Sequence, residues 1–135
     1  MKKIIFTISA FITVVFVVLM FSKCTNVVSS SSLIFPDSLI SYQRDVAPFM
    51  AVKCAYAGCH GDNPIGGASR MSDYISLMGS DNIGLIIPTK PDNSILIQIL
   101  ENTLPHLYYA FPQGYITDNQ KKGMRQWILE GAKSN

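Results

Sequence analysis

The sequence predicts a mainly α-helical domain of short helices and long loops, and three observations lead to this expectation. Apolar residues recur at helical spacing in segments near residues 41–53, 92–101 and 117–131. Glycine and proline recur between these segments as turn residues, and no internal repeat is found. The one strand-like run, Leu85-Ile86-Ile87, is too short for a convincing strand before Pro88 ends it.

The first expected helix runs from about residue 41 to residue 53. Tyr42 and Val46 lie on its apolar face at helical spacing. Pro48 marks a kink or a restart within it, because proline cannot donate a backbone hydrogen bond. The helix leads directly into Cys54.

Two further helices are expected in the middle of the chain. A brief one follows Ser72 and ends at Gly79. The other spans residues 92–101, where Asp92 or Asn93 can cap its first turn.

The last helix has the strongest local signals. Thr117 and Gln120 form a capping-box pair, in which each side chain can satisfy a backbone N–H group of the other. Met124 and Trp127 then recur on one apolar face, and Gly131 ends the helix.

The first 23 residues have the pattern of an export signal and are not expected to belong to the fold. Two lysines give a basic start, and residues 4–21 are apolar except for Thr and Ser. Cys24 stands where a bacterial lipoprotein takes its diacylglycerol, although Lys23 replaces the usual small residue. We expect lipidation at Cys24, with an uncleaved anchor or plain cleaved secretion as alternatives, since about 17 to 25 apolar residues can span a bilayer. The chain is therefore expected to be exported and membrane-anchored, on the periplasmic or cell-surface side of a bacterial membrane.

Residues 24–38 are expected to be a Ser-rich tether, and residues 39–135 a single domain. Removing residues 1–23 removes three of the eleven basic residues, which leaves eight against nine acidic residues. A chain with no basic surplus lacks the charge that holds a phosphate backbone. Nucleic acid is therefore not an expected partner.

The most informative stretch is Cys54-Ala55-Tyr56-Ala57-Gly58-Cys59-His60-Gly61. Two thiols on one short loop can add to the two vinyl groups of a haem, and the histidine that follows can bind its iron. The sequence therefore predicts one covalently bound haem c, attached through Cys54 and Cys59, with His60 as the proximal iron ligand.

The spacing between the two cysteines departs from the usual attachment motif, which has two intervening residues. Here the four residues 55–58 must bulge away from the porphyrin, and Ala55, Ala57 and Gly58 are small enough to allow this. Gly58 can also adopt a positive φ angle where the chain reverses before Cys59.

Two alternatives use the same residues without haem. In an oxidising compartment Cys54 and Cys59 could form a disulfide, with His60 on the surface after it. The two cysteines could instead join the only two histidines, His60 and His106, in a tetrahedral zinc site. Either would leave an interaction domain stapled by its cysteines.

Several stretches after residue 41 occur in an order typical of one family. The chain resembles the small c-type cytochrome domains of bacterial exported lipoproteins, common in the Bacteroidetes group and related to planctomycete-type cytochromes c. The resemblance implies a compact cytochrome c-like fold of about four short helices around one haem, with Met124 and Trp127 packed on Phe49 or Met50. The matching stretches are residues 41–48, 54–61, Gly66-Gly67, Ile87-Pro88, residues 91–94 and Trp127-Ile128-Leu129-Glu130-Gly131-Ala132.

The sixth ligand of the iron is where the chain departs from this family. The family usually carries a Met-Pro-Pro segment before the last helix, whereas this chain has Phe111 at the position of the methionine. His106 is the preferred distal ligand, which would lower the reduction potential relative to methionine and histidine ligation. An open or water-bound site, or ligation by Met71, Met78 or Met124, are the alternatives, and Tyr108 and Tyr109 are expected to line the pocket or cover the haem edge.

The expected function is that of a one-electron carrier outside the cytoplasmic membrane, serving redox partner proteins. A haem-based sensor of small ligands is the alternative if the sixth site is open. No Ser/His/Asp set, phosphate loop or paired-carboxylate site is found, so the chain is not expected to be an enzyme. It could still serve a dehydrogenase as a subunit or partner.

Overall fold

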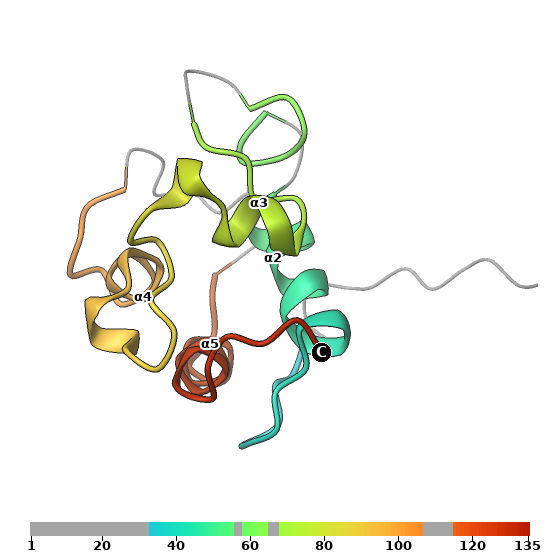
Figure 1. Ribbon diagram of the computed structural model, residues 1–135. Coiled ribbons are helices and arrows are strands. Elements are labelled where there is room, and N and C mark those ends of the chain that lie inside the picture. Colours follow the sequence, from blue (N-terminus) through green and yellow to red (C-terminus); the bar gives the residue numbers. More distant parts are fainter. Residues whose placement is uncertain (1–32, 56–57, 65–67, 107–114) are drawn as a thin grey trace, which may run out of the picture.

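The computed structural model describes residues 33–55, 58–64, 68–106 and 115–135 (Figure 1). Every regular element among these residues is helical, which confirms the mainly α-helical expectation. Among them no helix is long and apolar enough to cross a membrane. The predicted export signal, Cys24 and most of the tether lie outside the described residues, as do Gly66-Gly67, Tyr108, Tyr109 and Phe111.

Seven short elements make up the described fold. They are η2 (a π-helical segment, Tyr42–Val46), α2 (Ala47–Lys53), α3 (Tyr74–Met78), η3 (a 3₁₀ turn, Ser80–Asn82), η4 (a 3₁₀ turn, Pro91–Asn93), α4 (Ile95–Leu100) and α5 (Asp118–Leu129).

The first expected helix is present as two consecutive segments, η2 and α2. The backbone N–H of Val46 donates to the carbonyl oxygen of Ser41, five residues earlier, at 3.2 Å. This wider π turn precedes Pro48, which lies in the first turn of α2, where its missing N–H costs no internal hydrogen bond. The predicted interruption is therefore a change of helix type just before the proline.

The predicted capping residues are found in α5 but not in α4. Thr117 and Gln120 form the predicted capping box of α5, and Asp73 forms another with Ser76 at the start of α3. The prediction that Asp92 or Asn93 caps the helix before residue 101 is wrong. Both belong to η4, and Ser94 is the N-cap residue of α4 instead.

The hydroxyl of Ser94 explains why it occupies that position. It is completely buried, accepts from the backbone N–H of Ile87 at 2.9 Å and donates to the carbonyl oxygen of Lys90 at 2.9 Å. It therefore fastens the preceding loop instead of capping the first turn of α4.

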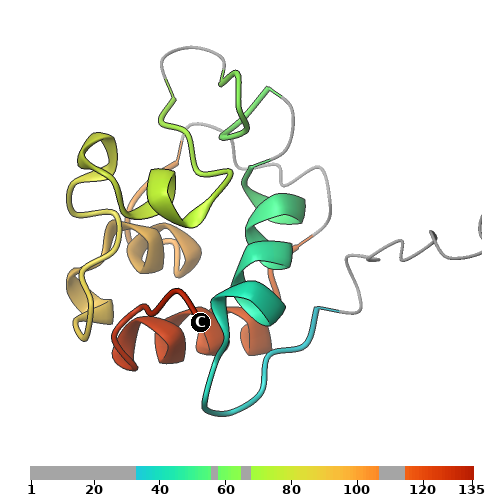
Figure 2. The same ribbon diagram turned by 45° about the vertical axis from the view of Figure 1, so that its right-hand side comes forward.

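The core lies between α5, α4 and the η2–α2 segment, which stands across α5 in Figure 2. The Tyr42 ring packs on Trp127, with ring centroids 5.9 Å apart, and on Tyr74 at 5.1 Å. Met124 and Trp127 belong to the same buried cluster as Phe49 and Met50. In that cluster Tyr42 is the aromatic neighbour of Trp127.

The core also includes residues ahead of Leu39, where the sequence placed the start of the domain. Phe35 is buried against Phe49, with ring centroids 5.7 Å apart. Its backbone exchanges two hydrogen bonds with the Asn119 side chain, at 2.8 Å and 3.0 Å. Gly123 of α5 makes room for Phe35, because a Cβ atom there would overlap the phenylalanine side chain.

Three non-glycine residues with positive φ angles surround the C-terminal end of α5. They are Leu39 (φ 55°), Thr89 (φ 66°) and Ala132 (φ 50°). The backbone N–H of Thr89 donates to the carbonyl oxygen of Ile128, and that of Leu39 donates to the Glu130 carboxylate, both at 2.8 Å.

Candidate functional site

Cys54 is positioned by the helix that precedes it. It is the C-cap residue of α2, and its backbone N–H donates to the carbonyl oxygen of Met50 at 2.9 Å. Met50 and Phe49 anchor this turn in the core. The first cysteine of the motif is therefore attached to a rigid, buried helix end.

A backbone hydrogen bond holds His60 next to Cys54. The backbone N–H of His60 donates to the carbonyl oxygen of Cys54 at 3.1 Å. Gly58 has a φ of 87°, as predicted for the reversal before Cys59. Cys54 and Cys59 are both free thiols in this structure. Tyr56 and Ala57 lie outside the described residues.

The surroundings of Cys54 favour the protonated thiol. Burial raises the pKa of Cys54 to about 12, the nearby Cys59 also raises it, and the Lys53 ammonium lowers it by less. Part of the residue surface is exposed, but the thiol group itself is desolvated. A thiol in this state is a poor nucleophile near neutral pH.

The His60 ring is held in one tautomer. Its Nδ1 atom lies 2.7 Å from the carbonyl oxygen of Ser69. A carbonyl oxygen can only accept, so Nδ1 carries the proton, and in the neutral ring the lone pair is on Nε2. This is the arrangement that orients an imidazole for a metal.

A second contact joins His60 to the loop that supplies this carbonyl group. The backbone N–H of Met71 donates to the carbonyl oxygen of His60 at 2.8 Å, and the Met71 side chain is buried in the core. Asn82, also buried, donates through Nδ2 to the carbonyl oxygens of Arg70 and Ser76, at 2.9 Å and 2.7 Å. Asn82 therefore holds in place the chain segment that follows Ser69.

Charged and polar side chains also connect residues within the same loop. Arg70 pairs with Asp73 and with Asp62, the latter at 3.3 Å, and Ser72 donates to Asp62 at 2.7 Å. These groups are largely exposed, so each contact adds little stability alone. Together they connect the two ends of the segment between His60 and α3.

His106 lies beside His60, although 46 positions separate them in the sequence. The two ring centroids are 6.0 Å apart, and the ring planes are inclined at 49°. The structure thus brings together the predicted proximal ligand and the preferred distal one. Across the described ranges, no group of three or more His, Cys, Asp or Glu residues is placed to hold a metal ion.

The methionines proposed as alternative ligands take part in packing. Met71 and Met124 are buried members of the core cluster, and Met78 packs against that cluster. Met124 has no exposed surface at all. Their sulfur atoms therefore have an apolar packing role in this structure.

Lys53 is a site residue that the sequence analysis missed. It directly precedes Cys54, is only 3% exposed, and its Nζ donates to the carbonyl oxygen of Tyr115 at 3.3 Å. Burial lowers its pKa, while Cys54 acts in the opposite direction. The sequence does contain a signal for the burial of Lys53. This residue follows Phe49 by four positions and so lies on the same, buried face of α2.

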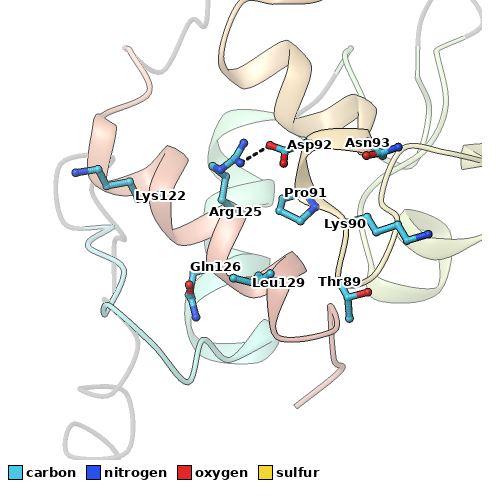
Figure 3. A pocket seen from close by; sticks show the side chains of 9 residues that line it. All are labelled: Thr89, Lys90, Pro91, Asp92, Asn93, Lys122, Arg125, Gln126 and Leu129. Atoms are coloured by element: carbon cyan, nitrogen blue, oxygen red, sulfur yellow. Dashed lines mark hydrogen bonds and ion pairs between the residues drawn. The ribbon is translucent and has the colours of Figure 1, made fainter.

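A shallow surface cavity of about 550 Å³ lies between η4 and α5 (Figure 3). None of the cysteines or histidines of the candidate site lines it. Arg125, which lines this cavity, forms ion pairs with Asp92 and with Glu101. Lys90 and Lys122 also line the cavity, so its lining carries three basic side chains and one acidic side chain. Its lining residues are Thr89, Lys90, Pro91, Asp92, Asn93, Lys122, Arg125, Gln126 and Leu129.

No family model, curated protein or solved structure matches this chain. The residues of the site therefore have to carry the assignment of function by themselves.

Proposed function

We propose that this chain is a single-haem c-type cytochrome that carries one electron at a time outside the cytoplasmic membrane. The observation that carries the proposal is the geometry at Cys54, Cys59 and His60. Two free thiols share one closed loop, and the histidine that follows keeps Nε2 available because Nδ1 donates to Ser69.

The two cysteines supply the two thiols that covalent attachment requires, and Cys54 would react before folding buries its thiol. Each thiol would add across one vinyl group: the sulfur bonds to a vinyl carbon, and a hydrogen ends on the neighbouring carbon. No oxidant or reductant is consumed by this addition. Cys54 would join the haem to the end of α2, and Cys59 would join it to the loop that begins at Gly58.

His60 would be the proximal ligand of the iron. Its hydrogen bond to the carbonyl oxygen of Ser69 fixes the ring orientation. Bound haem supplies one-electron iron chemistry, and the protein sets the potential through its ligands and the polarity around them. The chain would need no substrate site of its own for this role, and redox partner proteins would exchange the electron.

The export signal and Cys24 add the cellular setting to this proposal. A lipid at Cys24, or an uncleaved anchor, would hold the domain at the membrane through the Ser-rich tether predicted for residues 24–38. The oxidising compartment outside the cytoplasm is also where exported cysteines must be protected from random disulfide formation. Attachment to haem would consume both Cys54 and Cys59.

The test is the reduced pyridine haemochrome spectrum of the full chain, exported in a bacterial strain that contains haem-attachment machinery. We expect the spectrum of two thioether bonds, and the spectrum of a single bond or loss of haem in Cys54→Ala and Cys59→Ala. Cys24→Ser is the matched control, because it removes a cysteine outside the site and should leave the spectrum unchanged. Colourless protein from a strain that matures a reference cytochrome would refute the proposal.

A further inference from the structure

We infer that His60 and His106 are both axial ligands of one haem iron, which makes the centre a six-coordinate bis-histidine site. The inference rests on the proposed function, because it concerns the haem attached at Cys54 and Cys59. It is carried by the position of the two rings, whose centroids lie 6.0 Å apart in the folded chain.

This separation is the one that a shared metal ion needs. An imidazole nitrogen binds a transition metal at about 2 Å. The nitrogen lies roughly 1 Å from the centre of its own ring, so two imidazoles on opposite sides of one iron have centres roughly 6 Å apart. The inclination of 49° between the ring planes is compatible with this, because each ring can rotate about its bond to the metal.

His106 is delivered to this position by the end of α4. Leu96, Ile97 and Leu100 bury the inner face of this helix in the core. After Leu100 the backbone N–H groups of Thr103 and Leu104 both donate to the carbonyl oxygen of Gln98, at 2.8 Å and 3.1 Å. Asn102, with a φ of 59°, allows the chain to turn away from the helix axis there.

The two histidines are thus supported by separate parts of the fold. His60 is held through Ser69 and Met71, and His106 follows a turn anchored on α4. An imidazole pair placed by two independent scaffolds is a better candidate for ligation than a methionine that must first leave the core.

The competing sulfur ligands would have to give up that packing. Met71 and Met124 are buried in the core, and Met124 lies on the inner face of α5 beside Trp127. Moving either sulfur atom to an iron would open a cavity where it now packs. The geometry therefore favours His106 among the residues that the structure describes.

Bis-histidine ligation has two consequences for function. It lowers the reduction potential relative to methionine and histidine ligation. It also closes the sixth position, so the reduced protein should not bind carbon monoxide at neutral pH. Both consequences favour an electron carrier over a sensor of small ligands.

The test uses the full-length haem protein and its ligand-sensitive spectra. The near-infrared charge-transfer band and the electron paramagnetic resonance of the ferric form identify the axial pair directly. We expect the bis-imidazole signature and no carbon monoxide binding. His106→Ala should lose that signature and bind carbon monoxide, and added imidazole should restore the low-spin spectrum. Leu104→Ala, in the same turn, is the control and should change neither property.

The outcomes separate this inference from the proposed function. Covalent haem with an unchanged spectrum in His106→Ala, or a wild-type signature of methionine ligation, overturns the inference and leaves the cytochrome intact. Absence of covalent haem in the wild type overturns both. The wild-type spectra decide the matter even if the variant fails to accumulate.

Discussion

Glu130 at the end of α5 accepts a hydrogen bond of 2.9 Å from the backbone N–H of Ile40, which lies ninety positions earlier in the chain. The same carboxylate accepts from the backbone N–H of Leu39 and from the Gln126 side chain, both at 2.8 Å. One side chain therefore joins the two ends of the described fold.

This contact predicts a loss of stability in acid. Burial raises the pKa of Glu130, but hydrogen bonds from Gln126, Leu39 and Ile40 and the charge of Lys133 outweigh it and lower the pKa below its ordinary value of 4.5. A carboxylate with a depressed folded-state pKa stabilises the fold above its unfolded-state value, and that stability is lost as the pH falls through the folded-state value. Glu130→Gln should lower the free energy of unfolding by about 1–2 kcal/mol at pH 7.

The measurement is urea unfolding of wild type and Glu130→Gln at pH 7 and at pH 3. The difference between them should shrink at the lower pH, because the wild-type carboxylate is then increasingly protonated. Asp37→Asn, an exposed position near the same segment, is the control. A difference of equal size at both pH values would contradict the prediction.

Gly123→Ala should destabilise the fold, although alanine is the better helix former. A Cβ atom at this position would overlap the side chain of Phe35, which is buried on α5. We expect a loss of about 1–3 kcal/mol in the free energy of unfolding, typical of overpacking. Lys122→Ala, an exposed neighbour in the same helix, is the matched control and should be neutral or slightly stabilising. A stabilised Gly123→Ala protein would show that Phe35 does not pack there.

Asn82→Ala should weaken the loop that orients His60. The side chain donates to the carbonyl oxygens of Arg70 and Ser76, and its loss leaves both without that donor. We expect a loss of about 1–3 kcal/mol in stability. If the chain binds haem as proposed, its potential should also shift, because the segment that carries the Ser69 carbonyl group would be held less firmly against His60. Asp81→Ala is the exposed control, and a potential unchanged in Asn82→Ala would limit that residue to a structural role.

Cys54 of the haem-free chain should react more slowly with alkylating reagents in the folded state than in the unfolded state. Because burial raises the pKa of Cys54 to about 12, its thiolate fraction at pH 8 is roughly a thousandfold lower than its ordinary pKa of 9.0 would give. Cys54 in the Cys59→Ser variant should therefore react with iodoacetamide at least about a hundredfold faster after unfolding in urea. Mass spectrometry of timed samples measures this, and equal rates in the two states would contradict it.

The sequence was informative wherever the signal is local. The capping box of α5, the turn at Gly58 and the end of α3 at Gly79 each depend on a few neighbouring residues, and all three are present. The wrong N-cap prediction for α4 has a different origin. The hydroxyl of Ser94, the actual N-cap residue, forms hydrogen bonds with the backbone of Ile87 and Lys90 in the preceding loop.

Contacts between distant segments were beyond what spacing alone reveals. The burial of Phe35 depends on a glycine in α5, far along the chain. The meeting of His60 with His106 depends on how the turn after α4 directs the chain. The sequence indicated both histidines as candidate ligands, but only the folded chain gives the distance between their rings.

The left-handed backbone at Leu39 and Thr89 marks positions where a substitution could increase the stability of the fold. Glycine or asparagine occupies such a conformation at lower cost than a branched side chain, and Leu39 is 83% exposed, so little burial would be lost. Leu39→Asn should therefore be tolerated or add up to about 1 kcal/mol. A lineage that acquired it could accept costlier changes near Cys54, Cys59 and His60 without losing the fold.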